Sequence, residues 1–394
     1  QFLRIDAQNG RTRMSGSSIA APALRHSALV LGVLLGLFAV QHFATHGFTQ
    51  VNLDEAALGP QTTATFGTAD GRQVHCLYLK QLEGCLRDYA EHGKALPVTL
   101  WLGNSQLHAI NQFHPGEETA APELHRRLIA RGRYLLTASQ PNANLQEHYL
   151  LFAHLLTKVP LRQLVLPLVF DDLRETGIRP DLQAALDDPD TRELLSLSAT
   201  GNRLLSEHAS KDNLGNEVAA LEETVQESVE TFLSTTLAGV WPAWDNRNRV
   251  RGELFNEAYK TRNRVFGIKA SSIRRMIPGR YSANMQALDA ILDLAAARGV
   301  SVALYIAPLR DDVAPPYETT AYNGFKQQAA QIAGVAFHDL EGIVPASLWG
   351  RKDSTTGAGE AEIDFMHFQA GGHRILADAI EGIVLEQPVG TADR

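Results

Sequence analysis

Residues 98–111 read VTLWLGNSQLHAIN, and this stretch decides the fold. The apolar run Val98–Leu102 predicts a buried strand, and Gly103-Asn104-Ser105 follows it directly before a helical pattern. A strand that runs straight into a helix is typical of parallel α/β sheets, which bind ligands at the carboxyl ends of their strands. The stretch therefore predicts that Ser105 lies at such an end, at the start of a helix.

The same alternation of strand and helix continues along the chain. Further strands are expected at Tyr134–Ala138, Leu164–Phe170, Val302–Ile306 and Val335–His338. Amphipathic helices are expected at Glu123–Arg131, Leu145–Leu156, Asn284–Arg298 and Gly324–Ile332. This order predicts an α/β domain over residues 71–394, with a doubly wound parallel sheet of about five strands and helices on both faces. Strand patterns are missing from about 181 to 280, which predicts a helical insertion there.

Composition narrows the possible functions. The chain has 394 residues and a formal net charge of -8, so it lacks the basic surface that nucleic-acid binding requires. Its two cysteines, Cys76 and Cys85, are too few for a disulfide scaffold or a four-ligand zinc site. They can still bond to each other in an oxidising compartment, or serve as two separate small apolar residues.

Residues 27–48 form the most apolar stretch of the chain. Their length is close to the roughly 20 residues that span a bilayer, and Arg11, Arg13 and Arg25 precede them, so they predict a transmembrane anchor after a cytoplasmic segment 1–26. A linker, 49–70, would then lead to a domain outside the cytoplasm, on the periplasmic or extracellular side. A cleaved secretory signal and a buried core helix are the alternatives.

The end of the insertion is both basic and aromatic. Residues 241–280 contain two tryptophans, two phenylalanines and a series of arginines. Such a stretch could rest on anionic lipid or on a membrane partner. The alternative is a solvated helix face with buried aromatic side chains.

Two local patterns suggest serine chemistry. Ser105 is placed where free N–H groups can hold an oxyanion, although a serine at that position can also simply cap the helix. Near the C-terminus, Asp364-Phe365-Met366-His367 puts an acid and a histidine three residues apart. Within one turn, the histidine could take the serine proton while Asp364 fixes its tautomer; the alternative is a helix cap with an exposed histidine.

Together, the strand–Gly103-Asn104-Ser105–helix block and the D-x-x-H block before the last helix resemble the SGNH, or GDSL-like, hydrolases. The resemblance implies Ser105 as nucleophile, His367 as general base and Asp364 as the orienting acid. Asn104 stands where the family commonly has Asp. The family's other oxyanion donors have no clean counterpart in this sequence. Gly103 at the end of the first strand, and Asn142 and Asn144 after the second, are the candidates for holding the oxyanion. After the third strand, Arg174 is a candidate for a substrate-binding or charge-balancing role.

The anchor and the outward domain are similar to accessory proteins of polysaccharide O-acetylation and teichoic-acid D-alanylation. The resemblance implies a serine acyltransferase or esterase that acts on acyl, above all acetyl, esters of an envelope or exported polysaccharide. It also implies a polytopic membrane-bound O-acyltransferase as partner, and the chemistry needs no metal or organic cofactor. The alternative function is a non-catalytic binding or assembly subunit that keeps the fold alone.

Overall fold

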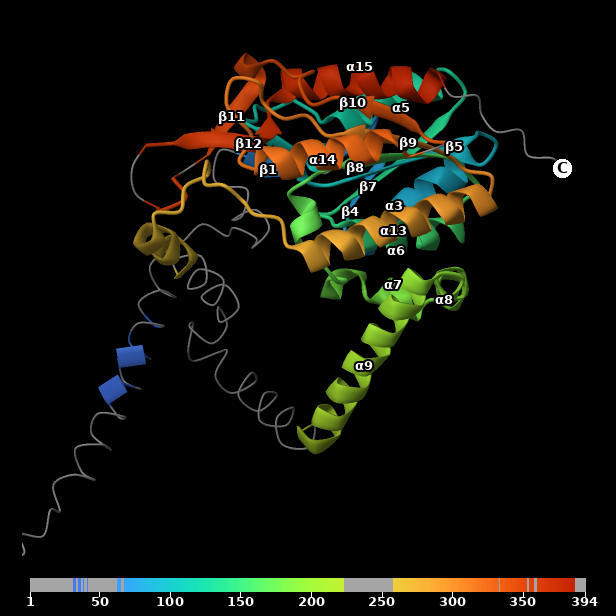
Figure 1. Cartoon of the computed structure of the whole chain (residues 1–394). Helices are drawn as coiled ribbons and strands as arrows, with labels where there is room; N and C mark the ends of the chain where they lie inside the picture. Colours follow the sequence, from blue (N-terminus) through green and yellow to red (C-terminus); the bar gives the residue numbers. More distant parts are fainter. Residues whose placement is uncertain are drawn as a thin grey trace, which may run out of the picture. The chain divides into compact units, whose positions relative to one another are not determined.

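The computed structural model describes residues 31–32, 35–36, 38, 41, 62–64, 67–222, 258–332, 334–352, 354–357 and 360–386. Most of them belong to one compact unit, Val51–Thr224 with Phe255–Arg394. At its centre lies a six-stranded sheet whose strand pairs are all parallel (Figure 1). In spatial order the strands are β10 (Ala336–Asp339), β9 (Ser301–Ile306), β8 (Leu161–Leu168), β5 (Val98–Gly103), β7 (Tyr134–Ser139) and β4 (His75–Leu77).

The strand order reverses at β5. From β5 the chain crosses to β7 on one side and then returns to β8 on the other side. The five strands β7-β5-β8-β9-β10 therefore follow the 2-1-3-4-5 order of doubly wound sheets, in which the ligand crevice opens at the carboxyl end of the strand at the reversal. Ser105 follows that strand.

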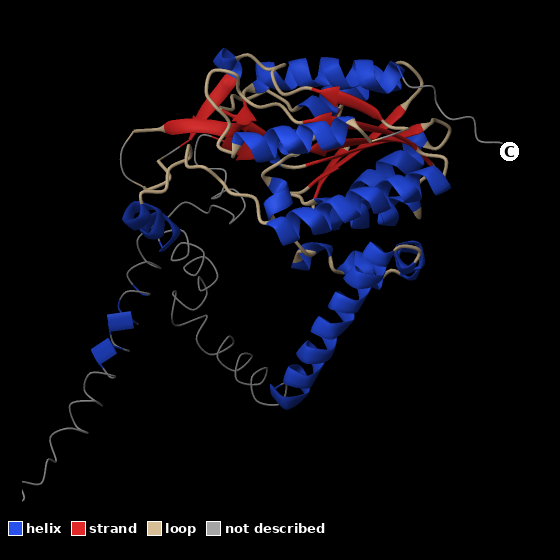
Figure 2. Ribbon diagram, in the orientation of Figure 1, coloured by secondary structure: helices blue, strands red, loops and turns tan. Residues whose placement is uncertain are grey.

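Helices cover both faces of the sheet, because side chains alternate between the faces along each strand. Leu100 and Leu102 pack with one group of helices, while Trp101 packs with the other. The first group contains α3 (Leu79–Asp88), α6 (Leu145–Leu156), α13 (Pro278–Ala297) and α14 (Thr319–Ala330). The second contains α5 (Ala120–Ile129) and α15 (Ala370–Glu386), and Figure 2 shows the strands between α15 and α13.

The predicted α/β class with helices on both faces is confirmed, but the predicted number of strands is wrong. All five expected strands are present, although β8 begins at Leu161 rather than Leu164. The sixth strand, β4, has only three residues and lies at the edge of the sheet. A run this short produces no alternation of apolar and polar residues, which explains why the sequence pattern did not reveal it.

Between β8 and β9 the described residues are mainly helical. They include η2 (Asp172–Arg174), η3 (Pro180–Leu182), α7 (Ala184–Asp187), α8 (Pro189–Ser196), α9 (Ala199–Glu222) and a helix at 258–266. The predicted anchor falls mostly outside the described residues. Among the residues that are described, no helix combines the length and apolar character needed to cross a membrane.

A small hairpin beside the sheet carries the C-terminal motif. Its strands β11 (Trp349–Lys352) and β12 (Glu362–Phe368) pair antiparallel, with Trp349 opposite Phe368 and Arg351 opposite Ile363. Trp349 and Arg351 are two positions apart in β11, whereas their partners Phe368 and Ile363 are five positions apart in β12. Residues 364–367 therefore form a bulge between the paired residues. The hairpin is anchored by Trp349 and Phe368, whose rings meet edge to face in the core.

Cys76 of β4 is disulfide-bonded to Cys85 of α3. The bond closes a loop with a sequence separation of 9 residues at the edge of the sheet. Closing such a loop restricts the unfolded chain, and its removal is expected to lower the free energy of unfolding by about 2–3 kcal/mol. We expect a Cys76→Ala/Cys85→Ala variant to show a correspondingly lower urea midpoint. Reductant should lower the midpoint of the wild type but not that of the variant; equal midpoints for the two oxidised proteins would contradict the prediction.

Candidate active site

Ser105 is the first residue of the short helix α4 (Ser105–His108). The helix is capped by Asn104, whose Oδ1 accepts a hydrogen bond from the Gln106 N–H at 3.0 Å. The alternative in which Ser105 itself caps the helix is therefore wrong, and its hydroxyl is available for another partner. Gly103 permits the tight turn, since a Cβ there would lie 2.7 Å from Leu107 Cδ2.

The hydroxyl of Ser105 joins a chain of hydrogen bonds with His367 and Asp364. His367 Nε2 lies 2.9 Å from Ser105 Oγ, and His367 Nδ1 lies 2.9 Å from Asp364 Oδ2. An ionised carboxylate can only accept, so Nδ1 carries the proton and Nε2 of the neutral ring accepts from the serine hydroxyl. The structure thus brings together the three predicted residues in the arrangement of a nucleophile, a base and an orienting acid.

Asp364 and His367 lie in the bulge of β12 rather than in a helix. Asp364 Oδ1 accepts from the backbone N–H groups of Met366 and His367, at 2.8 and 3.1 Å. These bonds fold residues 364–367 into a turn that aims the imidazole back at Ser105. The alternative of a helix cap with an exposed histidine is wrong, because His367 is buried.

The side chain of Asn111 in β6 (Ala109–Asn111) also binds the Asp364 carboxylate. Its Nδ2 lies 3.0 Å from Asp364 Oδ2 and also reaches the carbonyl of Arg351 in β11. Burial alone would raise the pKa of Asp364, but the adjacent His367 and the donated hydrogen bonds hold that pKa down to about 2. Asp364 is therefore ionised at neutral pH and can stabilise a proton on His367.

Arg310, in the loop after β9, fixes the hairpin from the other side. Its Nη1 donates to the carbonyls of Gly350 and Asp364, at 3.2 and 3.3 Å, while Nε and Nη2 bind Asp312. Sequence patterns could not reveal Asn111 or Arg310, because their partners lie 253 and 54 residues away.

His108, one turn beyond Ser105, belongs to a separate buried chain of hydrogen bonds. The Thr137 hydroxyl donates to the carbonyl of Val74, so this hydroxyl must accept from His75 Nδ1. The other ring nitrogen, His75 Nε2, then accepts from the Ser139 hydroxyl. The Ser139 hydroxyl in turn accepts from His108 Nδ1. The pKa of His108 is well below its ordinary value, mainly because the side chain is buried, and the neighbouring His75 lowers it further. Burial thus favours the neutral form of His108, and His367 is the histidine that contacts Ser105 Oγ.

The asparagines predicted as oxyanion donors have different surroundings. Asn144 caps α6: its Oδ1 accepts from Gln146 N and Glu147 N, and its Nδ2 donates to the carbonyl of Gly177. The side-chain amide nitrogen of Asn144 thus already donates a hydrogen bond within the fold. Asn142 is exposed in the preceding turn, with a φ of 49°.

Arg174, which is predicted to bind substrate or to balance charge, forms an ion pair at the carboxyl end of β8. Its Nη1 pairs with Asp171 at 3.0 Å, and its Nε donates to the carbonyl of Arg275. Arg274 pairs with the other oxygen of the same carboxylate. Two arginines at the carboxyl end of β8 thus balance the negative charge of Asp171.

The next residue, Asp172, is buried behind the nucleophile turn and accepts from Asn104 Nδ2 at 2.7 Å. Burial raises the pKa of Asp172 well above its usual range, despite that hydrogen bond. A raised folded-state pKa means that the folded protein binds the proton more tightly than the unfolded chain. The free energy of unfolding therefore falls as pH rises from the unfolded pKa, about 4, towards the folded pKa.

We expect Asp172→Asn to remove this part of the pH dependence. The variant should gain stability relative to the wild type as the pH rises above about 4, because the asparagine stays neutral and its oxygen can still accept from Asn104. Urea midpoints across that range measure the effect. Asp289→Asn, which removes an exposed carboxylate of α13, is the control; parallel curves for wild type and Asp172→Asn would contradict the prediction.

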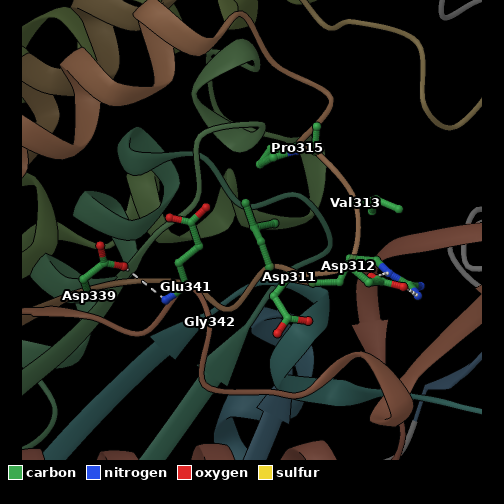
Figure 3. Close-up of a pocket in the computed structure, with 10 residues that line it drawn as sticks. Asp311, Asp312, Val313, Pro315, Asp339, Glu341 and Gly342 are labelled. Carbon is green, nitrogen blue, oxygen red and sulfur yellow. Dashed lines mark hydrogen bonds and ion pairs between the residues drawn. The ribbon is translucent and has the colours of Figure 1, made fainter.

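A cavity of about 690 Å³ lies at the carboxyl ends of β9 and β10 (Figure 3). Acidic side chains surround it: Asp311, Asp312, Asp339 and Glu341. Of these, Asp312 is paired with Arg310, while Lys326 pairs with both Glu341 and Asp339. None of the three residues Ser105, His367 and Asp364 lines the cavity, and Arg310 connects it with the hairpin that carries two of them. The hydrogen-bonded triad, not this cavity, therefore defines the candidate site.

Within the described part of the chain, no group of three or more His, Cys, Asp or Glu side chains is arranged to hold a metal ion. Comparison with known proteins adds no relative to this picture: no protein-family model matches the chain, and no curated protein matches its sequence.

Proposed function

We propose that this protein is an SGNH-type serine acyltransferase or esterase. The observation that carries the proposal is the continuous chain of hydrogen bonds from Ser105 Oγ through His367 to Asp364, each 2.9 Å long. In this mechanism Ser105 Oγ attacks the acyl carbonyl carbon while its proton moves to His367 Nε2. When the tetrahedral intermediate collapses, His367 returns that proton to the departing oxygen, and an acyl-serine remains.

The second half of the reaction repeats these steps with an acceptor. His367 removes a proton from an acceptor hydroxyl, whose oxygen attacks the acyl-serine, and Ser105 recovers its proton as the leaving group. A sugar hydroxyl as acceptor makes the reaction a transfer, and water makes it a hydrolysis. The backbone N–H of Ser105, as the first of α4, has no acceptor within the helix and is our candidate donor to the oxyanion.

We infer an extracytoplasmic setting and an envelope or exported polysaccharide as acceptor. The Cys76–Cys85 bond supports the setting, because such bonds persist in oxidising compartments. The resemblance to accessory proteins of polysaccharide O-acetylation suggests acetyl as the acyl group and a membrane-bound O-acyltransferase as partner.

A non-catalytic binding or assembly subunit is the second candidate. Two observations favour it: Asn144 is committed to capping α6, and Ser105 is only 4% exposed. A substrate carbonyl must therefore reach a recessed hydroxyl, with fewer obvious oxyanion donors than the resemblance implies.

Covalent capture of the nucleophile tests the proposal. A fluorophosphonate probe reacts with a serine that a neighbouring base activates, so we expect one adduct, located by mass spectrometry on the peptide that contains Ser105. Ser105→Ala should lose the adduct, whereas Ser196→Ala, which removes an exposed serine of α8, should keep it. A folded protein that shows no adduct, or shows it elsewhere, would support the assembly-subunit function.

A further inference from the structure

Exposed apolar side chains of the compact unit gather in one stretch, residues 258–277, which we call the basic–apolar segment. It exposes Tyr259, Val265, Phe266, Ile273 and Ile277, and Phe266 and Val265 are each 72% exposed. Elsewhere among the described residues of this unit, Leu197 is the one large apolar side chain that is comparably exposed. Concentrated exposure of this kind marks an interaction surface, whereas scattered single residues do not.

The same stretch is strongly basic within an acidic protein. Residues 258–288 contain seven Lys or Arg and no Asp or Glu, although the whole chain has a net charge of -8. Arg262 and Arg264 are exposed, and among the described residues their hydrogen-bond partners are neutral: the side-chain oxygen of Asn263 and the carbonyl of Thr356. Their positive charge is therefore available to an anionic partner.

The basic–apolar segment is held firmly on the hairpin of β11 and β12, which we call the catalytic hairpin because it carries Asp364 and His367. Asn263 is fully buried and donates to the carbonyl of Thr355 at 3.1 Å. Glu362, the first residue of β12, accepts from the Ala270 N–H at 2.6 Å. The helix at 258–266 and the loop after it are thus attached to the element that carries Asp364 and His367, and Figure 1 shows this helix beside the hairpin.

We propose that the basic–apolar segment docks on the surface of an anionic lipid bilayer. Cations alone would suit any polyanion, but Val265, Phe266 and Ile273 gain free energy only from an apolar layer, which a hydrated anionic glycan lacks. Each Lys or Arg near an anionic surface adds attraction that falls off within a Debye length. Docking would hold the catalytic hairpin close to the headgroups. This inference does not depend on the proposed chemistry.

The test places a fluorescent reporter in the segment of the full chain. Because both native cysteines are bonded to each other, a nitrobenzoxadiazole label attached to Phe266→Cys reports on this site alone. With vesicles of phosphatidylcholine and phosphatidylglycerol we expect a blue shift and a rise in emission that pure phosphatidylcholine does not produce. The same label on Leu197→Cys, which is 68% exposed outside the segment, is the control and should not respond.

Charge is tested in the same background. Adding Arg262→Gln, Arg264→Gln and Lys269→Gln to Phe266→Cys should abolish the response, as should raising the salt concentration from about 0.05 to about 0.5 M. No response to anionic vesicles, or an equal response at Leu197→Cys, would overturn the proposal. So would tight binding to dextran sulfate without any response to vesicles. Turnover of soluble p-nitrophenyl acetate should be unchanged in the charge variant, so a failure of docking is distinguishable from a failure of the acyl chemistry.

Discussion

Replacement of Ser105 by alanine is expected to lower kcat/KM for p-nitrophenyl acetate by about 10⁴- to 10⁶-fold. In the proposed mechanism Ser105 Oγ is the atom to which the acyl group bonds, and the variant has no hydroxyl beside His367 Nε2 to replace it. His108 cannot serve as an alternative centre, because burial lowers its pKa and its Nδ1 is engaged with Ser139. Steady-state release of p-nitrophenolate measures the effect.

The Ser105 prediction requires that folding is unaffected. Among the described side chains, only His367 forms a hydrogen bond with the Ser105 hydroxyl. The urea midpoint of Ser105→Ala should therefore stay close to that of the wild type. Ser196→Ala serves as the matched control and should keep full turnover. Equal turnover in wild type and Ser105→Ala would remove Ser105 as the nucleophile and favour the assembly-subunit function.

Asp364→Asn is expected to lower kcat by about 10³- to 10⁴-fold with little change in KM. An asparagine can donate to His367 Nδ1, which places the ring proton on Nε2 and removes the acceptor for the serine hydroxyl. It also removes the negative charge that stabilises the protonated imidazole during the reaction. We expect the effect in the chemical step, because Asp364 is buried and binds His367 Nδ1.

Two comparisons make the Asp364 prediction specific. Glu360→Gln removes an exposed carboxylate from the same hairpin and should leave kcat unchanged. In a working triad the three residues act as a unit, so Ser105→Ala/Asp364→Asn should be no slower than Ser105→Ala alone. A further large loss in the double variant would mean that Asp364 contributes to some other step.

Much of the fold could be predicted because its strands are buried on both faces. Val98–Gly103 reads as an apolar run in which Thr99 is the one polar side chain. The helix α6 spans Leu145–Leu156 as expected, and Asn144 and Glu147 form a capping box at its start. The strand at His75–Leu77 could not be predicted, since it is stabilised by pairing with β7 and by the disulfide rather than by its own pattern.

The candidate site was predictable only where its chemistry is local. Ser105 stands out because a strand ends immediately before it, and Asp364 and His367 because they are three residues apart. Asn111 and Arg310 were missed, since the tertiary fold alone brings them to Asp364. The bulge of β12 was also missed, because Ile363, Phe365 and Phe368 suit a helix and a strand equally well.

The triad joins residues that are 262 positions apart, and this separation sets a time order for biosynthesis. The nucleophile turn and all six strands of the sheet are complete once residue 339 has been made. His367 and Asp364 follow only in the hairpin at 349–368. In the proposed mechanism, a nascent chain halted before that hairpin would carry Ser105 without its base, so acyl chemistry would begin only after all six strands of the sheet have been made.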